Sequence, residues 1–183
     1  MGIFDQLSAL FRREPETLSD QPGSWEQERR SKPRVNARDG TRVLIIDDSK
    51  TVVMAIKKYL RSVGYVTFEA FDAETGLNLI REQTPELVFL DIMLPGMNGF
   101  AALRTIRRDP QTRDIPVIMM SGNEQAMEQF FGARIGADDF MKKPFSREEV
   151  FFRIDRLLDN DCVPRRAKLD SHTAPDPSAA PVA

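Results

Sequence analysis

The sequence predicts an α/β fold in which helices cover both faces of a five-stranded parallel sheet. Short apolar runs rich in β-branched residues alternate with stretches of helical spacing, and three of the runs are almost continuously apolar, as strands buried on both faces are. The runs span residues 43–46, 65–68, 87–90, 116–120 and 139–141. Five β-α units in a row imply parallel strands joined by right-handed crossovers.

The helical stretches are recognised by apolar residues three and four positions apart. They contain Val52, Ile56, Tyr59, Leu60 and Val63 in one segment, Leu103 and Ile106 in another, and Val150, Ile154, Leu157 and Leu158 in the last. Ser49 and Ser146 stand at N-cap positions, and Glu149 follows Ser146 in a capping-box arrangement. Helices are therefore expected to begin just after each serine.

Composition divides the chain of 183 residues into three parts. Residues 1–41 read as an amphipathic helix and a linker, residues 42–158 as the folded domain, and residues 159–183 as a disordered tail rich in proline. The helix would present Ile3, Phe4, Leu7, Leu10 and Phe11 on one face. We expect that face to dock on a partner or on the domain and not on a membrane.

Several classes of chemistry are excluded by residue counts. The chain has one histidine, His172, and one cysteine, Cys162, which excludes a Ser-His-Asp triad, a multi-histidine metal site and an internal disulfide. No signal peptide or membrane span is visible, so a cytoplasmic location is expected. The net charge of −2 argues against strong nucleic-acid binding.

Polar side chains gather where the predicted strands end. Asp47 and Asp48 follow the first strand, Asp91 the third and Ser121 the fourth, and Lys143 comes just after the fifth. Ligands of such sheets bind at the carboxyl ends of the strands. Adjacent carboxylates raise one another's pKa unless a cation neutralises them, and oxygen ligands without histidine or thiolate suit Mg²⁺.

A lysine and a hydroxyl beside metal-binding carboxylates can bind the oxygens of a transferring phosphoryl group. One aspartate would then be the nucleophile, since aspartate can form an acyl phosphate. Asp91 is the best candidate because apolar Leu90 and Ile92 flank it on the central strand.

These motifs resemble the receiver domain of two-component response regulators over about residues 42–158. The similar stretches are Val43-Leu44-Ile45-Ile46-Asp47-Asp48-Ser49, Leu90-Asp91-Ile92-Met93-Leu94-Pro95-Gly96-Met97-Asn98-Gly99, Pro116-Val117-Ile118-Met119-Met120-Ser121-Gly122 and Gly136-Ala137-Asp138-Asp139-Phe140-Met141-Lys142-Lys143-Pro144-Phe145. The resemblance implies a (βα)5 flavodoxin-like three-layer sandwich with strand order 2-1-3-4-5.

The resemblance also implies a role for each site residue. These are Asp91 as phosphoacceptor, Asp47, Asp48, Asp91 and the Met93 backbone carbonyl as Mg²⁺ ligands, Ser121 as switch hydroxyl, Lys143, before a cis proline, as phosphate-binding lysine, and Phe140 as switch aromatic. Lys142 is the competing lysine. The implied donor is the phosphohistidine of a partner kinase or phosphotransfer protein, and the implied output is a changed surface on the fourth helix, fifth strand and fifth helix.

We therefore expect a single-domain response regulator, not an enzyme, that acts on a downstream protein target. Its pattern is similar to stand-alone chemotaxis regulators and to those that control twitching motility. Two alternatives are an aspartate-nucleophile phosphohydrolase and a DNA-binding regulator that uses the basic linker at residues 29–38. An exposed aromatic is expected on the output face, among Phe130, Phe131, Phe140, Phe145, Phe151 and Phe152.

Overall fold

The computed structural model describes residues 35–123 and 136–166 of the chain. The predicted N-terminal helix, most of the basic linker, Phe130, Phe131 and the chain after Arg166 lie outside the described residues.

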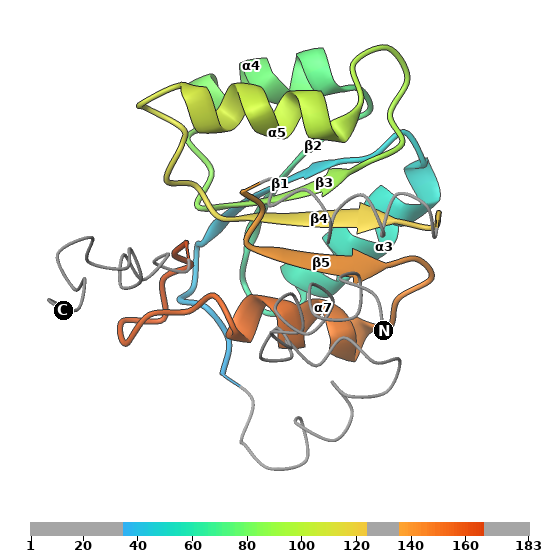
Figure 1. Ribbon diagram of the computed structural model, residues 1–183. Coiled ribbons are helices and arrows are strands. Elements are labelled where there is room, and N and C mark those ends of the chain that lie inside the picture. Colours follow the sequence, from blue (N-terminus) through green and yellow to red (C-terminus); the bar gives the residue numbers. More distant parts are fainter. Residues whose placement is uncertain (1–34, 124–135, 167–183) are drawn as a thin grey trace, which may run out of the picture. The chain divides into compact units, whose positions relative to one another are not determined.

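A parallel five-stranded sheet forms the centre of the fold, with the strand order β2-β1-β3-β4-β5 (Figure 1). Its strands are β1 (Arg42–Ile46), β2 (Val66–Ala70), β3 (Leu87–Asp91), β4 (Val117–Ser121) and β5 (Asp139–Lys142). Each lies within two residues of its predicted run. The predicted fold class and strand order are confirmed.

Helices cover the two faces of this sheet. They are α3 (Lys50–Arg61), α4 (Ala73–Gln83), α5 (Gly99–Arg108) and α7 (Arg147–Asp155). Figure 1 shows α4 and α5 together on one face and α3 and α7 on the other. Three of these helices correspond to predicted spacings, whereas α4 was implied only by the alternation of strands and helices.

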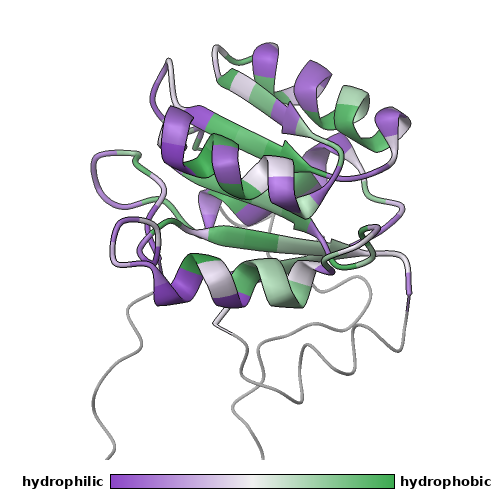
Figure 2. Ribbon diagram, turned by 90° about the horizontal axis from the view of Figure 1, so that it is seen from above, coloured by the Kyte–Doolittle hydropathy of each residue, from purple (hydrophilic) through white to green (hydrophobic). Residues whose placement is uncertain are grey.

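Each face of the sheet has its own hydrophobic core. Under α4 and α5 the strands contribute Leu44, Val88 and Met119, and under α3 and α7 they contribute Ile45, Phe89 and Ile118. Alternate residues of one strand point to opposite faces of the sheet. Because helices cover both faces, all six residues are fully buried. In Figure 2 the sheet is accordingly mostly green, with some white and purple positions, while the helices carry more purple. None of the described helices is long and apolar enough to cross a membrane.

Both predicted N-caps start a helix, but only one makes the capping bond. The Ser146 hydroxyl accepts a hydrogen bond from the Glu149 amide at 3.1 Å, which ties down the first turn of α7. Ser49 has extended N-cap geometry without a side-chain capping bond. Its amide instead donates to the Asp47 carboxylate at 3.0 Å, so this turn supports the strand-end aspartate.

The folded unit extends beyond the domain predicted for residues 42–158. Before β1, Ala37 is buried, and its amide donates to the Tyr65 hydroxyl at 2.6 Å. After α7, Val163 is buried in a stretch that was expected to belong to the disordered tail. Both flanking segments, 35–41 and 159–166, thus contribute buried residues to the folded unit, which differs from the predicted boundaries.

Candidate functional site

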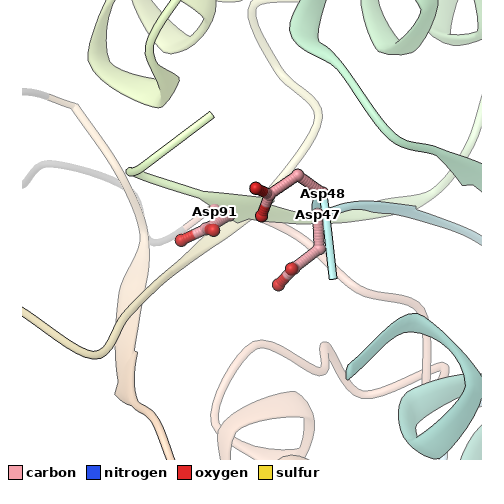
Figure 3. Close-up of side chains that lie close together, drawn as sticks. All are labelled: Asp47, Asp48 and Asp91. Atoms are coloured by element: carbon pink, nitrogen blue, oxygen red, sulfur yellow. The ribbon is translucent and has the colours of Figure 1, made fainter. Parts of the chain in front are cut away.

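The strand-end residues meet at one edge of the sheet. Asp47 directly follows β1, Asp91 ends β3, Ser121 ends β4, and Lys143 directly follows β5. Because β1, β3, β4 and β5 are consecutive neighbours in a parallel sheet, their carboxyl ends share that edge. One carboxylate oxygen from each of Asp47, Asp48 and Asp91 lies within 4.8 Å of the others (Figure 3).

Lys143 bridges two of these carboxylates. Its Nζ lies 2.6 Å from Asp47 Oδ2 and 2.9 Å from Asp91 Oδ2. Burial acts to lower the pKa of Lys143, but its contacts with these two carboxylates outweigh burial and raise the pKa above its ordinary value. The lysine therefore carries a positive charge at neutral pH and faces the oxygens of Asp91.

Burial makes the negative charge of the Asp47 carboxylate unfavourable. It is fully buried, and burial raises its pKa above the ordinary value although Lys143 and the Ser49 amide act to lower it. Among the described residues, Asp47 Oδ2 has ion-pair contact with Lys143 but no partner in hydrogen-bond geometry. A buried carboxylate oxygen without a hydrogen bond is costly, so it suits a cation.

The charge balance agrees with a divalent cation. One lysine against three carboxylates leaves an excess of negative charge that equals the charge of one such ion. The donors are all oxygens, which hard cations such as Mg²⁺ prefer. The residues present therefore fit a magnesium ion held by Asp47, Asp48 and Asp91.

The loop after β3 presents its backbone to this edge. The amide of Met93 donates to Asp91 Oδ1 at 3.3 Å, and the Met93 side chain is 56% exposed. These contacts place the Met93 amide beside Asp91, and the metal-binding role of the Met93 carbonyl stays a prediction.

Ser121 and Lys143 are joined through their backbones. The Lys143 amide donates to the Ser121 carbonyl at 2.8 Å, and the Ser121 hydroxyl accepts from the Asn123 amide at 3.0 Å. The Lys143–Pro144 peptide is cis, as the resemblance implied. Lys142, the competing lysine, is exposed at the end of β5, so it is Lys143 that reaches the carboxylates.

The predicted switch aromatic is an interior residue in this structure. Phe140 on β5 is only 5% exposed and belongs to the core under α4 and α5. Phe151 is buried as well, and Phe145 and Phe152 are half-buried, with two arginine guanidiniums near the Phe152 ring. The described part of the output face therefore lacks the expected exposed aromatic.

Gly99 was not recognised as a site residue from the sequence. It begins α5, and a Cβ atom at this position would lie 2.1 Å from the Asp91 carbonyl oxygen. Its amide donates to the Ile92 carbonyl at 3.0 Å. Only glycine allows this approach, so Gly99 fixes the loop that follows Asp91. The sequence signal for this role was the glycine that directly follows Asn98 at the start of the helix. An N-cap at Asn98 does not by itself require a glycine in the next position.

The family of this chain follows from sequence comparison. Residues 43–155, well over half of the chain, match the family described as response regulator receiver domain. The chain belongs to this family. The match covers all of the strand-end residues described above, and receiver domains of response regulators are signalling modules that accept a phosphoryl group.

Relatives of two kinds are similar to this receiver. Protein PilH of Pseudomonas aeruginosa is 35% identical over 117 residues, which are 64% of this chain and 97% of PilH. The DNA-binding dual master transcriptional regulator RpaA of Synechocystis is 38% identical over 128 residues, which are 69% of this chain. The chain spans only about half of RpaA, 53% of its length.

Solved structures agree with the fold. The receiver domain of the Francisella response regulator 1452 has a TM-score of 0.56 at 32% identity, covering 62% of this chain and 93% of that domain. The chemotaxis protein CheY4 of Vibrio cholerae has a TM-score of 0.60 at 24% identity, covering 65% of this chain and 99% of CheY4. The latter likeness concerns the fold alone.

Proposed function

We propose that Asp91 accepts a phosphoryl group from the phosphohistidine of a partner histidine kinase or phosphotransfer protein. The observation that carries this proposal is the contact of Asp91 Oδ2 with Lys143 Nζ at 2.9 Å, inside a cluster of three carboxylates. A carboxylate oxygen of Asp91 would attack phosphorus, the bond from phosphorus to the histidine nitrogen would break, and the imidazole would leave. The product is an acyl phosphate.

Lys143 has two tasks in this reaction. Before transfer its ammonium lies against a carboxylate oxygen of Asp91, a residue only 3% exposed, and so holds the proposed nucleophile in place. During transfer the same ammonium would lie beside the incoming phosphoryl oxygens and offset their charge. Asp47 holds the lysine from the other side, with its Oδ2 at 2.6 Å from Nζ.

Mg²⁺ is the proposed cofactor, held by Asp47, Asp48, Asp91 and the Met93 backbone carbonyl. When bound, it would neutralise the carboxylates and the phosphoryl oxygens. The buried Oδ2 of Asp47 supports the assignment, because a metal cation would add to the ion-pair contact that this oxygen makes with Lys143 Nζ.

The proposed output is a change of protein-protein contacts. Ser121 would turn toward the phosphoryl group, and Phe140 would repack beside it, so the surface around β5 and α7 would change. Ser121 and Phe140 lie on neighbouring strands, β4 and β5, which supports their coupling. We propose a cytoplasmic, stand-alone regulator of the chemotaxis or twitching-motility type with a protein target. The match to PilH supports the proposal of a stand-alone receiver, because it covers 97% of the length of PilH.

The test is Mg²⁺-dependent labelling of the full chain by a small acyl phosphate, followed by intact mass and peptide mapping. We expect one phosphoryl group per chain on Asp91, loss of labelling in Asp91→Asn and loss on chelation of Mg²⁺. Asp114→Asn is the matched control, because the Asp114 side chain is 84% exposed and lies outside the cluster. Undiminished labelling of Asp91→Asn would refute the proposal.

The two alternative functions have less support. A phosphohydrolase would release phosphate from a monoester in many turnovers, which the same samples can be assayed for. Of the basic linker only residues 35–38 are described, and the Arg38 guanidinium is paired with Glu86. DNA retention by the full chain that is lost on removal of residues 29–34 would favour the DNA-binding alternative.

A further inference from the structure

The segment after α7, which we name the C-terminal strap (Leu157–Arg166), folds back on itself. Leu158 forms an antiparallel bridge with Pro164, and the Arg165 amide donates to the Leu157 carbonyl at 2.7 Å. The Val163 amide donates to Asp159 Oδ1 at 2.9 Å. In Figure 1 this orange-red segment runs back toward the ends where β4 and β5 begin, away from the carboxylate cluster.

Arg166, the last described residue of the strap, binds three acceptors of the receiver. Its Nε lies 2.9 Å from Asp138 Oδ1, Nη1 lies 3.2 Å from the Arg113 carbonyl, and Nη2 lies 3.2 Å from the Gly136 carbonyl. Asp138 stands just before β5, and its side chain is only 2% exposed. The strap is thus fastened to a buried carboxylate at the base of the sheet.

Arg107 of α5 binds the same three groups. Its Nη2 lies 2.7 Å from Asp138 Oδ2, Nε lies 2.7 Å from the Gly136 carbonyl, and Nη1 lies 3.0 Å from the Arg113 carbonyl. Asp138 Oδ2 also accepts from the Val117 amide at 2.8 Å. The carboxylate is therefore already anchored to α5 and to the start of β4 without Arg166.

The two arginines differ in how much water they retain. The Arg107 side chain is 13% exposed and the Arg166 side chain 23% exposed. Burial lowers the pKa of Arg107 to about 10, and the charge of Arg166 adds to the lowering although Asp138 opposes it. Two guanidiniums beside one carboxylate repel each other, and departure of the outer one relieves that repulsion.

The strap also holds the chain segment that enters the domain. The Arg38 amide donates to the Cys162 carbonyl at 3.0 Å, next to the buried Ala37. Loosening of the strap would therefore free both ends of the folded unit together.

We propose that the C-terminal strap is a releasable latch, closed by Arg166 on an Asp138 site that Arg107 keeps intact when the latch opens. The opened latch leaves Asp138 Oδ1 to water and frees the strap. The receiver core stays folded because Arg107 and the Val117 amide still bind Asp138 Oδ2. This inference does not depend on the proposed phosphorylation of Asp91.

The test compares Arg166→Ala with Arg107→Ala in the full chain by amide hydrogen exchange and thermal unfolding. For Arg166→Ala we expect exchange of the Arg165, Val163 and Arg38 amides to rise about tenfold, with a Tm within about 3 °C of wild type. For Arg107→Ala we expect a clearly larger fall in Tm. Arg113→Ala is the matched control, since it removes a nearby exposed charge and keeps the carbonyl acceptor.

Two results would overturn the latch. If Arg166→Ala lowered Tm as much as Arg107→Ala, Arg166 would be required for the stability of the receiver core and would not be a releasable contact. If exchange in the strap stayed at the wild-type rate in Arg166→Ala, Arg166 would not close the strap. Failure of Arg107→Ala to fold agrees with its anchoring role, and Arg166→Ala then decides the proposal alone.

Discussion

Magnesium binding should stabilise the folded chain through the carboxylate cluster. At an effective dielectric constant of about 20, two unit charges 4.8 Å apart, the largest separation in the cluster, repel by about 3.5 kcal/mol. Lys143 offsets only part of this repulsion, because it is one charge against three carboxylates. A divalent cation among these oxygens would turn the remaining repulsion into attraction.

The size of the effect follows from mass action. At a free Mg²⁺ concentration about ten times Kd, binding adds about 1.4 kcal/mol to the free energy of unfolding. For a domain of this size that corresponds to a rise in Tm of about 4 to 7 °C. The measurement is thermal unfolding in MgCl₂ against NaCl of equal ionic strength.

The variant Asp47→Asn sharpens this measurement. Because burial raises the pKa of Asp47, its charge is unfavourable in the metal-free fold, so the amide should raise the metal-free Tm. The same variant should lose most of the Mg²⁺-dependent rise, while Asp114→Asn should keep it. Equal Tm values in the two salts, or an undiminished rise in Asp47→Asn, would contradict the electrostatic account of the site.

Three further predictions concern pH, packing and capping. In metal-free buffer, wild-type stability should fall relative to Asp47→Asn as pH rises from 3.8 through the raised pKa of Asp47, since the folded state binds the proton more tightly; urea titrations across that pH range measure the difference. Gly99→Ala should lower the free energy of unfolding by about 1–3 kcal/mol and slow phosphoryl acceptance, because the new Cβ would lie 2.1 Å from a backbone carbonyl oxygen. Gly122→Ala should be tolerated, because its Cβ would lie 3.7 Å from the nearest atom. Equal unfolding midpoints for the two variants would refute this. Ser146→Ala should cost about 1 kcal/mol and Ser49→Ala clearly less, because only Ser146 makes a side-chain capping bond; chemical denaturation decides, and the reverse order would be inconsistent with the caps described.

The strands were predictable because strands buried on both faces have continuous runs of apolar residues. Residues 43–46, 87–90 and 117–120 are buried throughout, which is what such runs indicate. Helix α4 was not named from its spacing, although its buried residues Ala73, Leu77 and Ile80 lie four and three positions apart; Gly76 is a further inward position. A Cβ at Gly76 would lie 2.5 Å from Ile46 Cδ1, so the close approach of this helix to β1 favours glycine, which a pattern of apolar residues does not reveal.

The ends of the folded unit were not predictable for a related reason. Ala37 and Val163 are single buried apolar residues in polar surroundings, and one residue has no periodicity. The strap is held by arginine contacts with carbonyl oxygens and with Asp138, which any sequence with surface arginines could contain. Such contacts follow from the tertiary fold and not from local pattern.

That the predicted site residues meet at one edge was predictable, because a parallel sheet brings strand ends together. The choice between Lys142 and Lys143 rested on the family resemblance, since both follow the predicted strand at residues 139–141. The structure resolves it by geometry, because Lys143 alone of the two contacts Asp47 and Asp91. Gly99 escaped notice because its importance lies in the side chain it lacks.

In the proposed mechanism, the hydrogen bond at Ser121 would set a threshold for switching without phosphorylation. Its hydroxyl accepts from the Asn123 amide, and a hydroxyl that turned toward Asp91 would give up that bond. A bond of this kind contributes about 1 kcal/mol, which is roughly a fivefold bias toward the resting rotamer. The Asn123 amide would thus lower the fraction of unphosphorylated protein in the active conformation. Sequence changes that shift the turn after β4 would raise or lower that fraction before they change the response to phosphorylation.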